Sequence, residues 1–372
     1  MSIHAHILAT LALALCIAPA SGAEQTGEQS SAPKRAEALK LALERLREQQ
    51  NADGSWGKRH TYAVTGLACL AHLAAADEPF DPQRGPHRKA LTRGIEYLLA
   101  QQKAGMFPKQ GHTWIHGQGF ATLALSEAYG RSLLCTRKPD LDLKRLRRVV
   151  QQAAIAITQH QSTSGGWWYT PGSPAQHEGS TTVFAVQALV SAANYGLQVD
   201  EKALERGFEY LKKCQNPDGG FDYKLGPGTV SMKEGTAAGV ATLSLMKKFD
   251  YGVMIDGMKF LHTIGHDAIS KERFPYYGHF YGCMGMKLFG EEMAAQEKTD
   301  AYIAAVHATL LGWQQRNGEW PQRGWMIQNG GEDGAYSTAF ASLCLAIPDA
   351  RLSIFNRRPP TLPESDSREE NG

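Results

Sequence analysis

Acidic side chains recur in this chain just before its most apolar stretches. Glu178 in "QHEGSTT" and Glu234 in "MKEGTAA" each precede a glycine and a run of small and apolar residues. Asp333 in "GEDGAYST" has the same place before a third run. Carboxyl groups that meet in one site can act as general acid and base, and a neighbouring imidazole can tune them. We therefore expect Glu178 and Glu234 to carry any acid–base chemistry, with His177 tuning the first.

Aromatic and histidine side chains occupy corresponding positions before or within the other apolar stretches. Aromatic rings can wall an apolar ligand or stabilise a cation over their faces. Together with the acids, they are candidates to line a central cavity: Trp114, His116, Tyr276, Tyr277, His279, Tyr281, Asp333 and Tyr336.

A structural explanation competes with the chemical one. Carboxylates and hydroxyls at the start of a helix accept hydrogen bonds from free backbone N–H groups and complement the helix dipole. Shielding by aromatic rings would raise a carboxyl pKa, whereas the positive helix end would lower it and Lys233 could neutralise Glu234. The aromatic side chains could simply fill the centre. The sequence leaves both explanations open.

These stretches belong to a repeat with a period near fifty residues. A Gln, a glycine turn and an aromatic follow an amphipathic run in "LREQQNADGSWG", "LLAQQKAGMFP", "ITQHQSTSGGWWY", "LKKCQNPDGGFDY" and "LGWQQRNGEWP". Another unit, around "AISKERFPYYGHFYG", lacks the Gln and the glycine turn. The glycine can cap the preceding helix, while the Gln bonds backbone there and the aromatic packs on the neighbouring unit. We expect this motif to be a structural clamp between units.

Each unit contains two different helical patterns. "EKALERGFEYLKKC" has a single apolar stripe, whereas "TVFAVQALVSAANYG" is apolar or small on nearly every side. A helix that is apolar all round must be buried all round. Six helices of each kind predict an all-α fold, an (α/α)6 toroid with the apolar helices in its inner ring.

The repeated Gln and Gly-x-Trp or Gly-x-Phe pattern resembles the "QW" repeats of squalene and terpene cyclases. The β-subunits of protein prenyltransferases share this helical toroid. The resemblance covers about residues 35–356 and is closest to secreted bacterial members of this superfamily. It implies that the inner helices begin around the central opening, and that the opening holds an isoprenoid or other apolar ligand.

The motifs that carry the reactions of this superfamily are absent. Squalene cyclases protonate their substrate from Asp-x-Asp-Asp, and "DLDLK" at 140–144 lacks the last Asp. Prenyltransferases hold zinc with Asp, Cys and His, and Asp-x-Cys does not occur here. His279 and Cys283 are four residues apart, but two ligands do not make a zinc site. We therefore expect no cofactor and no metal.

Composition limits the partner and location of the protein. The 372 residues carry a formal net charge of +2, which gives no indication of nucleic-acid binding. Residues 1–23 contain no Lys, Arg, Asp or Glu and have an apolar core that ends in small residues, so they predict a signal peptide and a secreted or periplasmic protein. No later run is long enough to span a membrane. The basic cluster "LKRLRR" leaves peripheral membrane contact open.

The predicted domains are a signal peptide (1–23), a flexible leader (24–34), the toroid (35–356) and a disordered tail (357–372). Five cysteines lie beyond the predicted signal peptide, widely spaced and mostly within apolar helical patterns, and we expect buried free thiols rather than a disulfide framework.

Three classes of function remain open. The first is a binding protein or enzyme for an isoprenoid or other apolar ligand, which the resemblance favours. The second is a carbohydrate-active lyase or hydrolase, because α/α barrels also host such enzymes. The third is a non-catalytic interaction scaffold. A closed aromatic cavity would support the first, an open polar groove the second and a filled centre the third.

Overall fold

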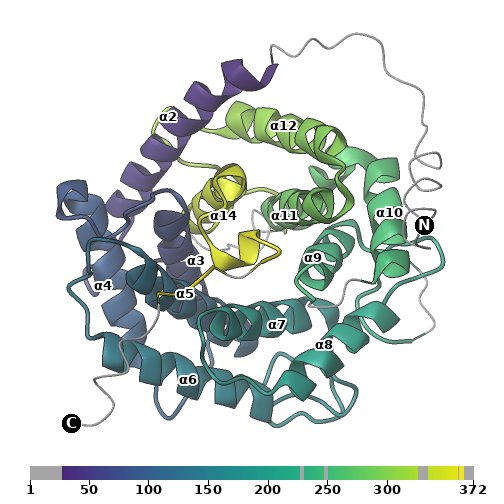
Figure 1. The fold of residues 1–372 in the computed structure, drawn as a ribbon, viewed down its shortest axis with the longest axis horizontal. Coiled ribbons are helices and arrows are strands. Elements are labelled where there is room, and N and C mark those ends of the chain that lie inside the picture. The colour runs from purple at the N-terminus through teal and green to yellow at the C-terminus, as the bar shows by residue number, and fades with distance from the viewer. Residues whose placement is uncertain (1–26, 227–229, 247–249, 326–333, 359, 364–372) are drawn as a thin grey trace.

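The computed structural model of the chain describes residues 27–226, 230–246, 250–325, 334–358 and 360–363. Within these ranges the chain forms twelve α-helices, and its β-structure there consists of isolated bridges in the turns. The helices lie in two concentric rings, as Figure 1 shows. The predicted all-α (α/α)6 toroid is confirmed.

The two rings divide the helices by their sequence pattern. The outer ring consists of α2 (Gly27–Glu48), α4 (Pro86–Gln101), α6 (Leu143–Gln159), α8 (Glu201–Lys213), α10 (Tyr251–Ile269) and α12 (Gln296–Trp313). The inner ring consists of α3 (Thr61–Ala74), α5 (Ile115–Leu134), α7 (Gly179–Asn194), α9 (Lys233–Leu243), α11 (Pro275–Met293) and α14 (Ala335–Ala346). Three short 3₁₀ turns accompany them: η1 (Pro82–Arg84), η2 (Ile347–Asp349) and η3 (Ser353–Phe355).

Burial explains which helix lies in which ring. In α7, every residue from 181 to 192 is buried, so this helix has no face for water. In α8, buried residues recur only at 203, 207, 208, 210 and 211, which form one stripe. The hydrophobic effect therefore places α7 between neighbours on all sides and leaves the other face of α8 in solvent.

The Gln of the repeated motif joins each unit to the next. The side-chain amide of Gln215 donates to Gly219 O in its own turn (3.1 Å) and to Val253 O in the following outer helix, α10 (2.8 Å). In four other units, the side-chain amide of the Gln donates a corresponding hydrogen bond to the following outer helix: Gln50 to Ala90 O, Gln102 to Val149 O, Gln161 to Ala203 O and Gln314 to Ala38 O. The last of these bonds closes the ring between the final and the first outer helix.

The aromatic of the motif serves both its own unit and the next. The indole N–H of Trp167 donates to Ile157 O near the end of α6 (2.7 Å). Its ring lies against Gly207 of α8, where an added Cβ would come within 3.1 Å of it. Gly207 is four residues after Ala203, the acceptor of the Gln161 bond, so one turn of α8 receives both side chains. The predicted clamp between units is thus observed.

The glycine of the turn brings two backbones together. Gly219 has φ +88°, and a Cβ there would lie 2.3 Å from Asp256 O in α10. The conformation and the close approach both require glycine, since L side chains rarely adopt such a φ. The unit without the motif contacts the next outer helix in a different way: the rings of His262 and His266 in α10 each pack edge-on against Tyr302 of α12.

The C-terminal end of the inner helices is closed by the segment around η3 (Figure 1). Glu127 of α5 is fully buried there and accepts four hydrogen bonds. They come from Ser353 N (2.9 Å), Ser353 Oγ (2.6 Å), Ser191 Oγ (2.9 Å) and Tyr195 OH (2.7 Å). The carboxylate of Glu127 therefore holds the η3 segment against the inner helices.

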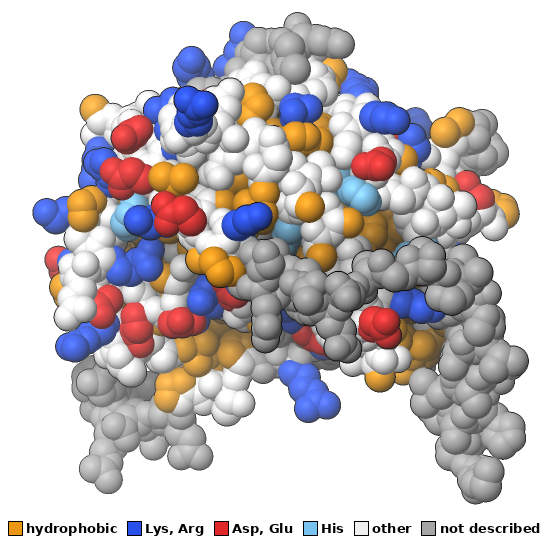
Figure 2. Space-filling view, turned by 90° about the horizontal axis from the view of Figure 1, so that it is seen from above, with side chains coloured by type: hydrophobic (Ala, Val, Ile, Leu, Met, Phe, Trp, Pro, Cys, Tyr) orange, Lys and Arg blue, Asp and Glu red, His pale blue; other side chains and the backbone are white. Residues whose placement is uncertain are grey.

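The surface seen in Figure 2 carries basic and acidic side chains interspersed rather than in blocks. Such mixing agrees with the small net charge of +2. Among the described helices, none combines the length and the apolar character that crossing a membrane requires.

Two predicted boundaries shift. Helix α2 begins at Gly27, inside the segment 24–34 that the sequence predicts as a flexible leader, and it includes Pro33. Arg357 donates to Met246 O (2.9 Å), and Leu362 packs against the core, so the predicted disordered tail is ordered in its first part. The predicted signal peptide (1–23) and residues 364–372 lie outside the described ranges.

Candidate functional site

A cavity of about 620 Å³ lies where the inner helices begin. His116, Ser180, Glu234, Tyr277 and Tyr336, near the first residues of α5, α7, α9, α11 and α14, all line it. Most of its wall is apolar or aromatic, with Ala63, Val64, Leu67, Phe120, Val183, Phe184, Phe221, Met232, Ala238, Phe274, Trp325 and Phe340.

Glu178 is the N-cap of α7 and is almost completely buried. Its carboxylate accepts hydrogen bonds from Ser180 N (2.9 Å), Ser180 Oγ (2.9 Å) and Thr181 N (2.8 Å). Burial raises the pKa of Glu178, and these hydrogen bonds act in the opposite direction. The capping explanation therefore describes Glu178 well, because its oxygens already hold the helix start together.

Glu234 has the same place in its repeat but a different environment. It is the second residue of α9, it is 3% exposed, and its side chain does not cap the helix. Burial raises its pKa, its own backbone N–H and Arg273 lower it, and Glu272 raises it further. Lys233 pairs with Glu272 at 2.6 Å, and its charge also lowers the pKa of Glu234. Glu234 is therefore a carboxyl group that is available to the cavity, which Asp222 also lines.

These two environments predict opposite effects of the same substitution. Glu178→Gln should lower the free energy of unfolding by about 1 kcal/mol, because it weakens a helix cap. Glu234→Gln should leave stability at about pH 8 unchanged or raised, because it removes a carboxylate whose ionisation burial disfavours. Thermal melting of both variants at about pH 4 and about pH 8 measures this.

The pH dependence follows from the direction of the shift. Because the pKa of Glu234 is raised in the folded state, its protonation stabilises the fold at pH values below its ordinary pKa of 4.5. That stabilisation is lost as the pH rises through the pKa of the folded state. The difference between wild type and Glu234→Gln should therefore vanish towards pH 4 and grow towards neutral pH. A fall in melting temperature of Glu234→Gln equal to that of Glu178→Gln would show that Glu234 is also a structural cap.

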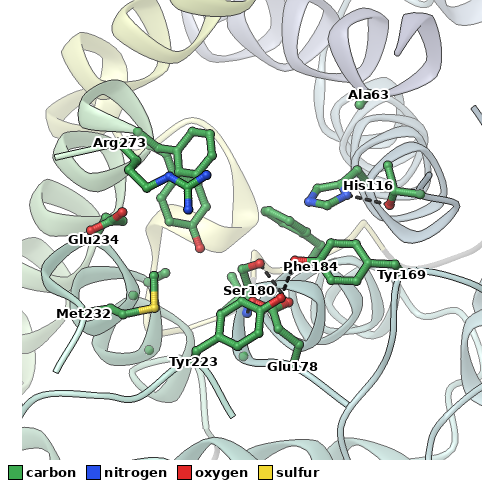
Figure 3. A pocket seen from close by; sticks show the side chains of 18 of the residues that line it. Ala63, His116, Tyr169, Glu178, Ser180, Phe184, Tyr223, Met232, Glu234 and Arg273 are labelled. Carbon is green, nitrogen blue, oxygen red and sulfur yellow. Dashed lines mark hydrogen bonds between the residues drawn. The ribbon is translucent and has the colours of Figure 1, made fainter. Parts of the chain in front are cut away.

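A pair of tyrosines forms the floor between the two acids. Tyr169 OH and Tyr223 OH are hydrogen-bonded at 2.8 Å. Figure 3 shows this pair beside Ser180 and Glu178, with Glu234 and Arg273 on one side of the cavity and His116 on the other. Neither tyrosine was among the predicted site residues, although each is two residues after the motif aromatic of its unit, in "GGWWY" and "GGFDY". That shared register was the signal that could have identified them.

The same tyrosines also hold the inner helices in place through their backbone. Tyr169 O accepts from Trp114 N (2.6 Å) at the start of α5, and Tyr223 O accepts from Gly179 N (2.7 Å) at the start of α7. In these two units, the turn therefore satisfies a free N–H group of the preceding inner helix.

His116 lies opposite Glu234 in a largely apolar setting. Its Nδ1 is 2.6 Å from Thr113 Oγ1, and its ring packs against Phe184 with centroids 4.9 Å apart. Burial, with smaller contributions from His60 and His112, lowers its pKa to about 3. His116 is therefore a neutral imidazole at physiological pH and adds no charge to the cavity.

Arg273 is a cavity residue that the sequence analysis did not identify. Its guanidinium lies 5.7 Å from the ring centroid of Phe274 and 5.8 Å from that of Trp325. Both rings and Arg273 line the cavity. This group is the positive counterpart of Glu234 at the mouth of the cavity.

Five of the predicted site residues line the cavity: Glu178, Glu234, His116, Tyr277 and Tyr336. Asp333 lies outside the described residues. The remaining predicted residues make contacts elsewhere and are not part of the cavity wall: His177, Trp114, Tyr276, His279 and Tyr281.

Helix geometry explains these corrections. His177 turns outward to Tyr210 OH (3.0 Å), and Trp114 packs edge-on against His160. Successive helix residues point about 100° apart, so α11 cannot direct Tyr277 and its neighbours the same way. Tyr276 OH donates to Pro321 O (2.7 Å), His279 Nε2 contacts Ser270 Oγ (3.0 Å), and Tyr281 OH donates to Gln187 Oε1 one turn deeper (3.2 Å).

Solved structures with this architecture include enzymes of two kinds. The type II terpene cyclase MstE from Scytonema matches with a TM-score of 0.55 and 14% identity, over 86% of this chain and 100% of that chain. A variant of MstE has been solved in complex with the substrate geranylgeranyl dihydroxybenzoate. An inactive variant of the α-1,6-mannanase GH76A of Salegentibacter sp. HEL1_6, in complex with α-1,6-mannotriose, matches with a TM-score of 0.58 and 12% identity, over 84% and 98%. At such identities the likeness shows the fold alone.

Sequence relatives cover less of the chain. The terpene cyclase-glycosyl transferase fusion protein fsoA of Humicola fuscoatra is 26% identical over 185 residues, which are 44% of this chain and 13% of that protein. The alpha-2-macroglobulin of Thermotoga maritima is 26% identical over 140 residues, 36% of this chain and 9% of that protein. The chain spans about a tenth of the length of these curated relatives.

The family model described as the prenyltransferase alpha-alpha toroid domain matches residues 132–262 and 257–361. These two matches together span more than half of the chain and cover four of its six helix pairs. The chain therefore belongs to the prenyltransferase alpha-alpha toroid family.

Proposed function

We propose that this chain binds an isoprenoid or similar elongated apolar molecule in the cavity at the start of its inner helices. The observation that carries this proposal is the cavity itself, about 620 Å³ with a mostly apolar and aromatic wall. That volume is in the range of small-molecule sites, which are typically apolar with a few placed polar groups. Removing the apolar surface of such a ligand from water supplies the binding free energy.

The polar groups of the cavity give the ligand an orientation. Glu234 and Arg273 lie on one side, whereas the opposite side presents the neutral His116 (Figure 3). The raised pKa of Glu234 favours its protonated form, which can donate a hydrogen bond or a proton into the cavity. We therefore place a polar end of the ligand at Glu234 and its hydrocarbon body against Phe120, Phe184 and Phe340.

The carbohydrate alternative is less well supported. Glycosidases generally use two carboxyl groups that are both free to act on the sugar. Glu178 does not meet this requirement, because three hydrogen bonds within the first turn of α7 occupy its oxygens. Asp222 also lines the cavity, and one of its oxygens accepts from Tyr223 N (2.6 Å). The mostly apolar wall also fits a sugar poorly. The scaffold alternative would fit a filled centre, whereas this ring keeps a cavity at one end.

Filling the cavity tests the proposal directly. Ala63 lines the cavity near His116, and Ala63→Phe adds a ring there without removing a hydrogen-bonding group (Figure 3). We expect this variant to weaken binding of geranylgeraniol by about tenfold or more, a free-energy change near 1.4 kcal/mol. Ala304→Phe is the matched control, because it adds the same ring at an exposed position of α12.

Binding is measured by tryptophan fluorescence titration and by native mass spectrometry of co-purified apolar molecules. Circular dichroism must show that both variants remain helical. Equal binding by Ala63→Phe and Ala304→Phe would place the ligand elsewhere. Binding of α-1,6-mannotriose together with no binding of geranylgeraniol would instead support the carbohydrate alternative.

A further inference from the structure

A second cluster of reactive side chains lies outside the cavity, in the core between the last two helix pairs. Cys283 of α11, His307 of α12 and Cys344 of α14 are all buried, and their ligand atoms lie within 4.8 Å of one another. Among the described residues, this is the group of three or more His, Cys, Asp or Glu side chains whose candidate ligand atoms lie this close together. No sequence motif marks the cluster, since the three residues are spread over more than sixty positions.

The contacts within the cluster resemble those of a preassembled ligand set. The candidate ligand atoms of the three side chains lie within 4.8 Å of one another, and the Cys344 thiol donates to His279 O (3.6 Å). His307 Nε2 also lies 3.1 Å from Cys344 O, which fixes the orientation of its ring. Metal-binding histidines are commonly oriented by a backbone carbonyl in this way.

A neighbouring hydroxyl gives an independent observation. Tyr302 of α12 is 8% exposed, and its hydroxyl is buried without a hydrogen-bond partner in the described structure. It points at Gly282, next to Cys283, where an added Cβ would lie 2.7 Å from the oxygen. An unpartnered buried hydroxyl is costly unless something beside it supplies a partner. A cation held by the cluster, with its remaining ligand, would supply one.

We infer that Cys283, His307 and Cys344 form a binding site for Zn²⁺, with water as the fourth ligand. Two thiolates and one imidazole are ligands that zinc prefers, and two sulfurs on tetrahedral zinc lie about 3.8 Å apart, given Zn–S bonds of about 2.3 Å. The observed group needs only a small contraction to reach this geometry. Binding replaces the two thiol protons, so the dithiolate and Zn²⁺ leave no net charge in the core.

The location of the site gives it a structural role. The seam between α10 and α12 lacks the Gln and glycine clamp of the other units, and α11 and α14 are the inner helices on either side of α12. A cation held by α11, α12 and α14 would tie this part of the ring together. None of the three residues lines the cavity, so the site stands apart from the proposed function.

The test is metal binding by the full chain after reduction and removal of metals with a chelator. We expect one Zn²⁺ per chain by elemental analysis after gel filtration, and a rise in melting temperature of about 5 °C at a hundredfold excess over the dissociation constant. Cd²⁺ should give a sulfur-to-metal charge-transfer band in the ultraviolet. Cys283→Ser and Cys344→Ser should abolish the bound metal and the band. Cys69→Ser, at another fully buried free thiol, should retain both.

X-ray absorption of the zinc-loaded wild type tests the site even if a variant does not fold. Two sulfur ligands with nitrogen or oxygen ligands are the expected shell. Absence of bound Zn²⁺ in the reduced wild type, or its full retention in Cys344→Ser, overturns the inference. A Cys283–Cys344 disulfide that persists in the purified protein and prevents loading after mild reduction overturns it as well.

Discussion

Glu127→Ala should lower the free energy of unfolding by about 3–5 kcal/mol, the cost of breaking a buried charged hydrogen-bond network. Glu127 is fully buried and accepts from Ser353, Ser191 and Tyr195, so the substitution leaves their donors unsatisfied. It also releases the η3 segment that closes one end of the ring. Urea unfolding followed by circular dichroism measures the loss.

Two further variants separate the network from a general effect of losing a glutamate. Glu205→Ala removes a glutamate from the exposed face of α8 and should change stability by less than about 0.5 kcal/mol. Glu127→Gln keeps the shape and one acceptor oxygen, and should lie between wild type and Glu127→Ala. A Glu127→Ala protein as stable as Glu205→Ala would show that the closing segment is held by its apolar contacts alone.

Gly219→Ala should destabilise the protein by at least about 3 kcal/mol, because it combines an unfavourable positive φ with a clash between two units. The added Cβ would lie 2.3 Å from Asp256 O, which belongs to the backbone of α10 and cannot rotate away. The side-chain amide of Gln215 donates hydrogen bonds to both Gly219 O and Val253 O. These hydrogen bonds must break if the two backbones are to move apart and relieve the clash. Thermal and urea unfolding measure the effect.

Gly172→Ala is the matched control for this substitution. Gly172 also has a positive φ, +73°, but nothing lies within 4 Å of the position of its Cβ. It should therefore show only the conformational cost, about 1–2 kcal/mol. If both variants lose the same stability, the seam between the units tolerates an extra methyl group and the clamp is looser than its geometry indicates.

The sequence alone determined the ring. The repeated motif is local: Gln, a glycine turn and an aromatic within seven residues suffice to end one helix and attach it to the next. The two hydrophobic patterns are also local, because a helix that is apolar on all sides can lie only in the inner ring. The motif repeats five times and the pair of helical patterns six times, so these short-range rules predict the fold without any knowledge of distant contacts.

The roles of the two acids could not be separated from the sequence. Glu178 and Glu234 occupy the same register before glycine, yet one caps its helix with three hydrogen bonds and the other faces the cavity. The difference depends on a two-residue shift in where each helix begins relative to its glutamate. It also depends on Glu272, which pairs with Lys233 from 39 positions away. Helix starts are the least predictable part of an element, and no local pattern encodes that pairing.

The cavity wall and the cysteine cluster were decided by tertiary structure. Tyr277 enters the cavity while Tyr276 does not, because a rotation of 100° per residue sends neighbouring side chains to different partners. Arg273 lies near Glu234 because the ring places the segment before α11 beside α9. Likewise, three separate helices of the ring bring together Cys283, His307 and Cys344. A repeat sequence specifies how each unit joins the next, whereas the groups that converge at its centre depend on the rotation of every inner helix at once.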